Sequence, residues 1–268
     1  MPSAISVVTL LTDFGERDYF VASMKGVILN INSQARIVDL SHAVTPHSIE
    51  EAAFLLQSCY HYFPDGTVHV IVVDPGVGSS RRPLLVSTSR FFFVAPDNGV
   101  LTPIFDNELS VEVRQIENRQ FRLDSEGATF DGRDLFAPAA AWLTRGQVPG
   151  TYGRLVRDYH RLSLPKPEVH EGVLKGRVAY IDHFGNVITD ITASDLNTLQ
   201  EVTKYAEISI EIGGMTVRGL KRHYGQGAKD SPAALLNSNG HVEIFLQEDR
   251  ADRLLQVKVG DPVVIRPV

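Results

Sequence analysis

Five of the six residues from Val68 to Val73 are β-branched, and this run constrains the fold more than any other stretch of the chain. A run of this kind without polar alternation is typical of a strand buried on both faces, as in a parallel sheet. The run stops at Asp74-Pro75-Gly76, a sequence that breaks regular structure. The sequence therefore predicts an interior strand of an α/β domain that ends just before Asp74.

Asp74 follows the carboxyl end of this predicted strand, where ligands collect in open α/β sheets. Two flexible residues, Gly76 and Gly78, and an arginine pair, Arg81 and Arg82, come next. An aspartate in a tight turn is an equally ordinary interpretation of this stretch taken alone. Asp74 is thus a candidate for chemistry that needs support from the rest of the chain.

The composition is that of an ordinary globular protein, with 43% hydrophobic and 22% charged residues among 268. The formal net charge of -6 argues against nucleic-acid binding, which usually requires a basic face. The single cysteine, Cys59, excludes an intrachain disulfide and a multi-cysteine zinc site. The N-terminus lacks a signal-peptide pattern, and no apolar run approaches the ~20 residues of a membrane span. We therefore expect a cytoplasmic protein with no membrane partner.

The first half of the chain alternates predicted strands and helices, including a helix at 19–31. This order favours a central, mostly parallel sheet covered by helices. A further helix is expected to begin near Thr45, with Thr45 as its N-cap and Pro46 in its first turn. We predict that this α/β N-terminal domain spans residues 1–164.

The second half has a different texture. Residues 165–169 contain two prolines and are expected to be a linker. Residues 170–268 contain short predicted strands, the last at 254–266, separated by Gly, Asn and Asp turns at roughly ten-residue spacing. This pattern predicts a smaller, all-β antiparallel, barrel-like C-terminal domain.

Four acidic residues of the first half, Asp13, Asp39, Asp74 and Asp97, lie at or just after predicted strand ends. One such residue is ordinary turn chemistry, but four in one sheet favour a single polar crevice at one edge.

Several separate blocks, in order along nearly the whole chain, carry a more specific signal. They are TDFGERDYFVASMKG, DLSHAVTPHSIEEAAFLL, FPDGTVHVIVVDPGVGSSRRPL, FVAPDNGVLT, TFDGRDLFAPAAA, IDHFGNVITDI and NSNG. Together they closely resemble the S-adenosylmethionine hydrolase (SAM hydroxide adenosyltransferase) family, whose relatives include the fluorinase and the chlorinase.

The resemblance implies an enzyme that converts S-adenosylmethionine to adenosine and methionine by attack of water or hydroxide on ribose C5′. It implies no metal or redox cofactor, because the sulfonium leaving group already carries the charge. It also implies a homotrimer, with each substrate site between the N-terminal domain of one subunit and the C-terminal domain of a neighbour.

The resemblance also assigns the catalytic residues. The family places an Asp, an Arg and a His around the attacking water, and Asp74 and Arg81 match the first two. Asp131 stands where many members have the His, so this chain departs from the pattern at the third position. The halogenases have an aromatic hydroxyl at the position of Asp74, and a carboxylate there favours hydrolysis over halide attack.

The remaining assignments concern substrate binding. Asp13 matches a carboxylate that holds the ribose hydroxyls, and Asp182 matches the acid that receives the methionine ammonium. Phe184 and Asn186 match positions that recognise adenine, and the other positions implied are Phe130 and Gly132 for the ribose wall, Tyr224 for adenine stacking, and Ser238 and Asn239 for the methionine carboxylate. Ordinary structural roles for these residues, such as a helix cap at Asp13 or a plain turn at 182–186, are the competing interpretation.

Three other functions stay open. A metal-dependent hydrolase has the ligand types it needs in Asp39, His42, His47, Asp74, Asp182 and His183, but no HExxH or His-x-His spacing supports it. A halogenase producing 5′-chloro-5′-deoxyadenosine is opposed by Asp74. A non-catalytic protein that binds S-adenosylmethionine or adenosine is made credible by Asp131.

Overall fold

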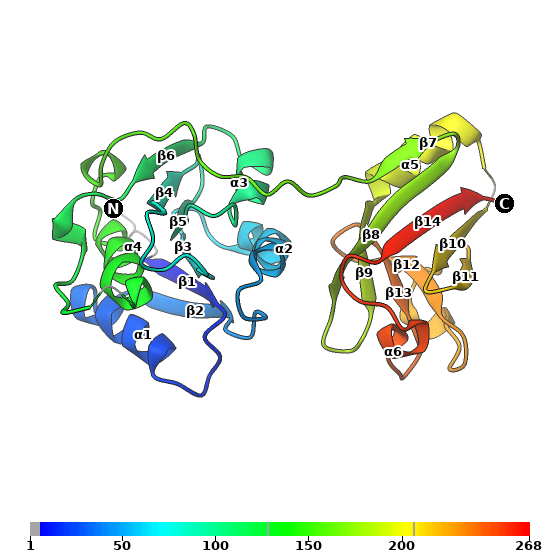
Figure 1. Cartoon of the computed structure of the whole chain (residues 1–268), viewed down its shortest axis with the longest axis horizontal. Coiled ribbons are helices and arrows are strands. Elements are labelled where there is room, and N and C mark those ends of the chain that lie inside the picture. The colour runs from blue at the N-terminus through cyan, green and yellow to red at the C-terminus, as the bar shows by residue number, and fades with distance from the viewer. Residues whose placement is uncertain (1–5, 128, 206) are drawn as a thin grey trace. The chain divides into compact units, whose positions relative to one another are not determined.

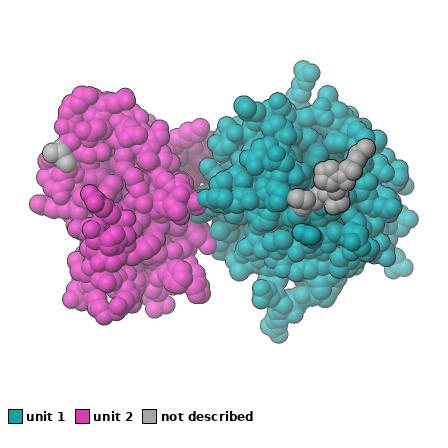
Figure 2. Space-filling view, turned by 180° about the vertical axis from the view of Figure 1, so that it is seen from behind, with its two compact units in different colours: residues 1–162 teal, residues 163–268 magenta. Residues whose placement is uncertain are grey.

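The computed structural model describes residues 6–127, 129–205 and 207–268 (Figure 1). The chain forms two compact units, Met1–Leu162 and Ser163–Val268, which are coloured separately in Figure 2. Within the segment expected as a linker, 165–169, the last two residues belong to strand β7 (Glu168–His170) of the second unit. No helix in the described part of the chain is long and apolar enough to cross a membrane.

The first unit is built on a six-stranded sheet, and the prediction of a mostly parallel sheet is confirmed. In spatial order its strands are β2 (Arg36–Ser41), β1 (Val7–Thr12), β3 (Val68–Val72), β5 (Phe92–Pro96), β4 (Pro83–Ser87) and β6 (Glu112–Gln115). The first four are parallel to one another, and β4 and β6 add an antiparallel edge. Parallel strands of this kind bring their carboxyl ends to one edge of the sheet.

Strand β3 lies inside this sheet and is buried on both faces, as its β-branched run predicts. Val70 and Val72 pack into the core that includes α1 (Phe20–Ile31) and α4 (Ala137–Thr144). Ile71 and Val73 point to the opposite face and pack into a second core. That core includes side chains of the helices α2 (Ile49–Cys59) and α3 (Thr102–Asn107). Packing on both faces of the sheet therefore holds β3 in place just before Asp74.

Helix α2 begins three residues later than the Thr45 N-cap predicts, and that prediction was wrong. Ser48 is the N-cap, and its hydroxyl accepts a hydrogen bond of 3.4 Å from the Glu51 N–H. The reason is local: His47 has a φ of 69°, a left-handed conformation that helical backbone does not adopt. The chain therefore cannot continue from Pro46 into the helix.

The second unit is an antiparallel, nearly closed barrel-like sheet, and this prediction is confirmed. Its strand order is β11 (Met215–Arg218), β10 (Ile208–Ile212), β14 (Pro262–Pro267), β8 (Val173–Ile181), β9 (Val187–Thr192), β13 (His241–Phe245) and β12 (Ala233–Leu236), with β7 paired to β8. The two ends of this order meet where the Lys221 N–H, just beyond β11, donates to the carbonyl of Ala234 on β12 at 2.7 Å.

Two helices of this unit were not predicted. Helix α5 (Ala193–Thr203) starts with a capping box in which Thr192 and Asp195 bond reciprocally. Helix α6 (Ala251–Leu255) occupies the start of the segment 254–266 that was expected to be a strand. Short 3₁₀ turns complete the structure, at η1 (Tyr60–Tyr62), η2 (Arg119–Phe121), η4 (Pro149–Thr151) and η5 (Tyr224–Gln226).

His69, the one position of the 68–73 run that is not β-branched, is fully buried in the first unit. Its Nδ1 lies 2.8 Å from the Thr9 hydroxyl, and its ring stacks on Phe93 at 5.1 Å between centroids. Burial disfavours the charged imidazolium and lowers the pKa of His69 from 6.5 to about 3. Between these two pH values only the unfolded chain binds a proton at this residue, so its contribution to stability is present above pH 6.5 and is lost as the pH falls.

We predict that replacing this histidine reduces the acid sensitivity of the fold. For His69→Phe, the free energy of unfolding falls less steeply below pH 6.5 than for the wild type, by up to about 1.4 kcal/mol per pH unit. Urea unfolding at several pH values between 7 and about 4 measures both slopes. Parallel curves for the two proteins contradict the assignment of a buried neutral histidine.

Candidate active site

Asp74 lies two residues beyond the end of β3, and its side chain is only 5% exposed. Its Oδ1 accepts a hydrogen bond of 3.2 Å from the Gly76 N–H, which closes a tight turn. Its Oδ2 accepts a hydrogen bond of 2.7 Å from Nε of Arg81. The carboxylate is therefore held at the carboxyl-end edge of the sheet by one backbone donor and one charged side chain.

Arg81 bridges two carboxylates. Its Nη2 contacts Oδ2 of Asp74 at 2.5 Å and also donates a short hydrogen bond to Oδ2 of Asp131. The guanidinium lies over the ring of Phe136, 5.4 Å from its centroid. Burial alone would lower the pKa of Arg81, but the hydrogen bonds to both carboxylates raise it above its ordinary value. Arg81 therefore stays charged, and the cluster carries two acidic groups for one cation.

Asp131 is brought to Arg81 by an unusual local conformation. One turn of π-helix, η3 (Gly132–Phe136), follows it directly, and the Ala137 N–H bonds to the carbonyl of Gly132. Single π-turns of this kind are frequent at functional sites. The same turn supplies both Asp131 and the Phe136 ring that packs against Arg81.

Gly132 has no room for a side chain. A Cβ at this position would lie 2.9 Å from the ring of Phe130 and 3.3 Å from that of Phe14. The rings of Phe14 and Phe130 pack edge to face at 5.8 Å, and Phe20 joins them at 5.1 Å from Phe130. The two predicted ribose-wall residues, Phe130 and Gly132, thus lie in an aromatic cluster next to Asp131.

Asp13 directly follows β1. Its Oδ2 accepts a hydrogen bond of 2.8 Å from the N–H of His47, the residue with the left-handed backbone. Within residues 6–127, 129–205 and 207–268, no donor is bonded to the other oxygen, Oδ1. Asp13 thus has a fixed orientation and one acceptor left for a ligand.

Asp39 and Asp97, the other two acids expected in the crevice, are held by structural partners. Asp39 lies inside β2, so its predicted place at a strand end was wrong, and Lys25 donates to it at 2.5 Å. Asp97 is 3% exposed and accepts hydrogen bonds from Nε of Arg82 at 2.8 Å and the His160 N–H at 2.7 Å. No group of three or more His, Cys, Asp or Glu side chains suited to a metal ion occurs in the part of the chain that the structure describes.

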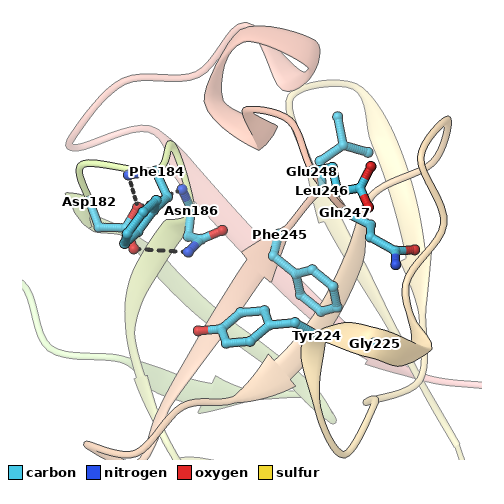
Figure 3. A pocket seen from close by; sticks show the side chains of 9 residues that line it. All are labelled: Asp182, Phe184, Asn186, Tyr224, Gly225, Phe245, Leu246, Gln247 and Glu248. Carbon is cyan, nitrogen blue, oxygen red and sulfur yellow. Dashed lines mark hydrogen bonds between the residues drawn. The ribbon is translucent and has the colours of Figure 1, made fainter.

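The second unit contains a pocket of about 460 Å³, which Figure 3 shows from close by. It contains four of the residues predicted to bind substrate, Asp182, Phe184, Asn186 and Tyr224. Its remaining lining residues are Gly225, Phe245, Leu246, Gln247 and Glu248. Ser238 and Asn239 are not among the residues that line it.

The turn at 182–186 presents an exposed aromatic ring at this pocket. Asp182 holds the turn, because its Oδ1 accepts from the N–H groups of Phe184 and Asn186, both at 2.9 Å. Its Oδ2 accepts from the side-chain amide of Asn186, also at 2.9 Å (Figure 3). Phe184 is 72% exposed, and Gly185 at the bend has a φ of 86°. A preformed turn with an exposed ring and an amide oxygen suits recognition of a flat, polar heterocycle.

A buried carboxylate that sequence reasoning missed supports the opposite wall. Glu243 is 3% exposed, and its Oε1 accepts a hydrogen bond of 2.7 Å from the Tyr224 hydroxyl. Its Oε2 accepts from the side-chain amide of Asn237 at 3.0 Å. Burial and this hydrogen bond to Glu243 raise the pKa of Tyr224 above its ordinary value, so the phenol stays neutral. The network ties Tyr224 to the turn at 237–240, where Asn237 also accepts from the N–H of Asn239 at 3.0 Å.

Comparison with known proteins identifies both units. Residues 8–153 match the model of the SAM hydroxide adenosyltransferase N-terminal domain, and residues 176–264 match that of the C-terminal domain. An (R)-S-adenosyl-L-methionine hydrolase of Thermus thermophilus is 34% identical over 96% of this chain and 98% of its own length.

More distant and structural relatives agree with these matches. A fluorinase of an Actinoplanes species is 29% identical over 71% of this chain and 73% of its own length. The crystal structure of an uncharacterized conserved protein from Thermotoga maritima superposes with a TM-score of 0.89 at 35% identity. It covers 97% of this chain and 99% of its own.

The buried position of Glu243 predicts that Tyr224 contributes to stability through its hydroxyl. Tyr224→Phe removes one of the two side-chain donors to a buried carboxylate and lowers the free energy of unfolding by about 1–3 kcal/mol. Tyr62→Phe is the matched control, because Tyr62 is 70% exposed, and it shifts stability by no more than about 0.5 kcal/mol. Urea unfolding measures both; equal stabilities of the two variants contradict a structural role for this bond.

Proposed function

Because the chain belongs to the SAM hydroxide adenosyltransferase family, we propose that it hydrolyses S-adenosylmethionine to adenosine and methionine. The observation that carries the proposal is the cluster of Asp74, Arg81 and Asp131 at the carboxyl-end edge of a parallel sheet. Two (R)-S-adenosyl-L-methionine hydrolases match nearly the whole of this chain and of their own length, and their names agree with the proposal.

The reaction needs an oriented water molecule and little else. The oxygen of water forms a bond to ribose C5′ while the C5′–S bond breaks, and the bonding pair leaves with sulfur as the neutral thioether of methionine. The proton lost by the attacking water passes to Asp74 or to solvent. Sulfur leaves readily because it already bears positive charge, so we propose that the reaction uses no metal or redox cofactor. Holding the water in line with the C–S bond supplies the main rate gain.

The charges of the cluster suit this chemistry. With both carboxylates ionised, Asp74, Asp131 and Arg81 carry one net negative charge in a largely buried place. A net negative charge attracts the cationic sulfonium and repels a halide ion. Asp74 Oδ2 is held by Arg81, so the carboxylate is oriented to accept a hydrogen bond from water. Hydrolysis is therefore favoured over the halogenase reaction, the second candidate function.

We propose the binding roles that the resemblance to the family implies for this chain. The free oxygen of Asp13 accepts from the ribose hydroxyls, and Phe130 and Gly132 form the wall next to C5′. Adenine stacks in the pocket of the second unit, where Phe184 and Tyr224 supply rings and Asn186 an amide. Asp182 receives the methionine ammonium, and the turn with Ser238 and Asn239 receives its carboxylate.

We propose that these two groups of residues meet in a homotrimer, in which the N-terminal unit of one subunit faces the C-terminal unit of a neighbour. The resemblance to the family supports this assembly. We also propose that the enzyme acts in the cytoplasm, where its single cysteine, Cys59, needs no partner.

Asp74→Ala tests the role of the cluster. We predict that it lowers the rate of adenosine formation at least about 100-fold, because the attacking water loses its hydrogen-bond acceptor and Arg81 keeps Asp131 as its one carboxylate partner. Liquid chromatography of adenosine and methionine measures the rate, with circular dichroism as a control for folding. Wild-type activity is expected to persist in a metal chelator. Undiminished turnover by a folded Asp74→Ala protein removes Asp74 from the mechanism.

Mixing two inactive variants tests the shared site. One variant carries Asp74→Ala, and the other carries Phe184→Ala with Asn186→Ala. If each site combines units of different subunits, trimers re-formed from an equal mixture regain about a quarter of wild-type activity, because about a quarter of the sites contain two intact units. Neither variant alone gains activity on the same treatment. A mixture as inactive as its components, in trimers shown by mass to be mixed, places the whole site within one chain.

A further inference from the structure

Four side chains contact one another in series next to residues 13–15, the loop that contains Asp13. They are those of Thr12, His42, Asp39 and Lys25. The Thr12 hydroxyl lies 2.9 Å from Nδ1 of His42, and Nε2 of His42 lies 3.0 Å from Oδ1 of Asp39. Lys25 on α1 donates to the other oxygen of Asp39 at 2.5 Å. These contacts thus join α1, β2 and the last residue of β1. The catalytic cluster does not use any of these residues.

The direction of these contacts follows from charge. Because the Asp39 carboxylate beside Nε2 accepts hydrogen bonds, we assign the ring proton of His42 to Nε2, which leaves Nδ1 to accept from the Thr12 hydroxyl. Among the described residues, Nε2 of His42 forms no regular hydrogen bond and contacts Asp39 only as an ion-pair partner, so the bond to Thr12 is the one that fixes the ring. Thr12 therefore donates its proton to His42, and its oxygen remains free to accept.

A hydroxyl, an imidazole and a carboxylate in sequence resemble a nucleophilic triad, but burial excludes that role. Thr12 is 0% exposed and His42 is 6% exposed, so the hydroxyl cannot reach a substrate atom. Asp39, by contrast, is 40% exposed at its side chain. Partial burial alone would raise the pKa of Asp39, but the hydrogen bond from Lys25 and the adjacent His42 ring outweigh it and lower the pKa. Asp39 is therefore an ionised anchor.

At the Thr12 and His42 end, this series of contacts holds the backbone around Asp13. The Thr12 oxygen accepts a hydrogen bond of 3.3 Å from the Phe14 N–H, and the carbonyl of His42 accepts one of 2.7 Å from the Gly15 N–H. Asp13 lies between these points, and its side chain is held by His47. Loss of the Thr12 hydroxyl leaves the loop with fewer bonds where Asp13 is presented.

We propose that Lys25, Asp39, His42 and Thr12 form a positioning relay that holds the Asp13 carboxylate in place for the ribose hydroxyls. The inference rests on the proposed function for the identity of the ligand. It makes Thr12 and His42 positioning residues, which act on substrate affinity through Asp13 and do not contact the reacting atoms.

The chain provides a matched control for this inference. Thr9 is also on β1, is also 0% exposed, and also contacts Nδ1 of a buried histidine, His69, at 2.8 Å. In the part of the chain that the structure describes, the Thr9 hydroxyl bonds to His69 and not to residues 13–15. Thr9→Val and Thr12→Val each remove a buried threonine hydroxyl from β1, and only Thr12→Val breaks the relay.

The experiment measures KM and kcat for S-adenosylmethionine and, by calorimetry, the dissociation constant of adenosine. We expect Thr12→Val to raise KM and the dissociation constant about tenfold with less than about a threefold change in kcat, and Thr9→Val to change neither. Urea unfolding shows whether both variants lose similar stability. Equal KM values for folded Thr9→Val and Thr12→Val overturn the inference.

A second pair of variants tests the relay even if Thr12→Val does not fold. Asp39 is at the surface, so Asp39→Ala and Asp39→Asn keep the fold. Asp39→Ala is expected to raise KM about threefold or more, and Asp39→Asn, which retains an acceptor for His42 but lacks the charge that attracts Lys25, to raise it less. Equal KM for wild type and Asp39→Ala overturns the relay. A wild-type protein that neither turns over S-adenosylmethionine nor binds adenosine instead refutes the proposed function.

Discussion

Two carboxylates that share one guanidinium are the interaction on which the rest of the site depends. Asp74 and Asp131 are far apart in sequence, and Arg81 bonds to both. Two acids this close and this buried repel each other unless a cation lies between them. The buried strand β3 delivers the first, the π-turn η3 delivers the second, and the ring of Phe136 supports the cation. One cation thus joins two segments of the first unit that are distant in sequence.

The two units contribute different chemistry. The first supplies charge and precise backbone geometry: an ion cluster at Arg81, and Asp13 held by a strained residue, His47, at φ 69°. The second supplies a pocket with exposed rings at Phe184 and Tyr224, backed by a buried carboxylate, Glu243. S-adenosylmethionine, the substrate that we propose, has a cationic sulfur between a nucleoside and an amino acid, so these two kinds of surface suit its two ends.

Much of this arrangement could be predicted from local patterns, because β-branched runs and strand-end acids are local signals. The strand ending before Asp74 is an example, and it is buried on both faces as predicted. Contacts between distant residues could not be predicted. Asp39 lies within β2 and bonds to Lys25, and Glu243 on β13 is paired with Tyr224 in η5. The late start of α2 depends on the backbone of His47, which its residue type does not reveal.

The most direct measurement of the central claim is the fate of the attacking atom. The wild-type protein is incubated with S-adenosylmethionine in ¹⁸O-labelled water containing chloride, and the products are analysed by mass spectrometry. A water molecule held at the Asp74–Arg81–Asp131 cluster predicts adenosine labelled at its 5′ oxygen, unlabelled methionine and no chlorinated nucleoside. Unlabelled adenosine, or 5′-chloro-5′-deoxyadenosine as the main product, contradicts the account.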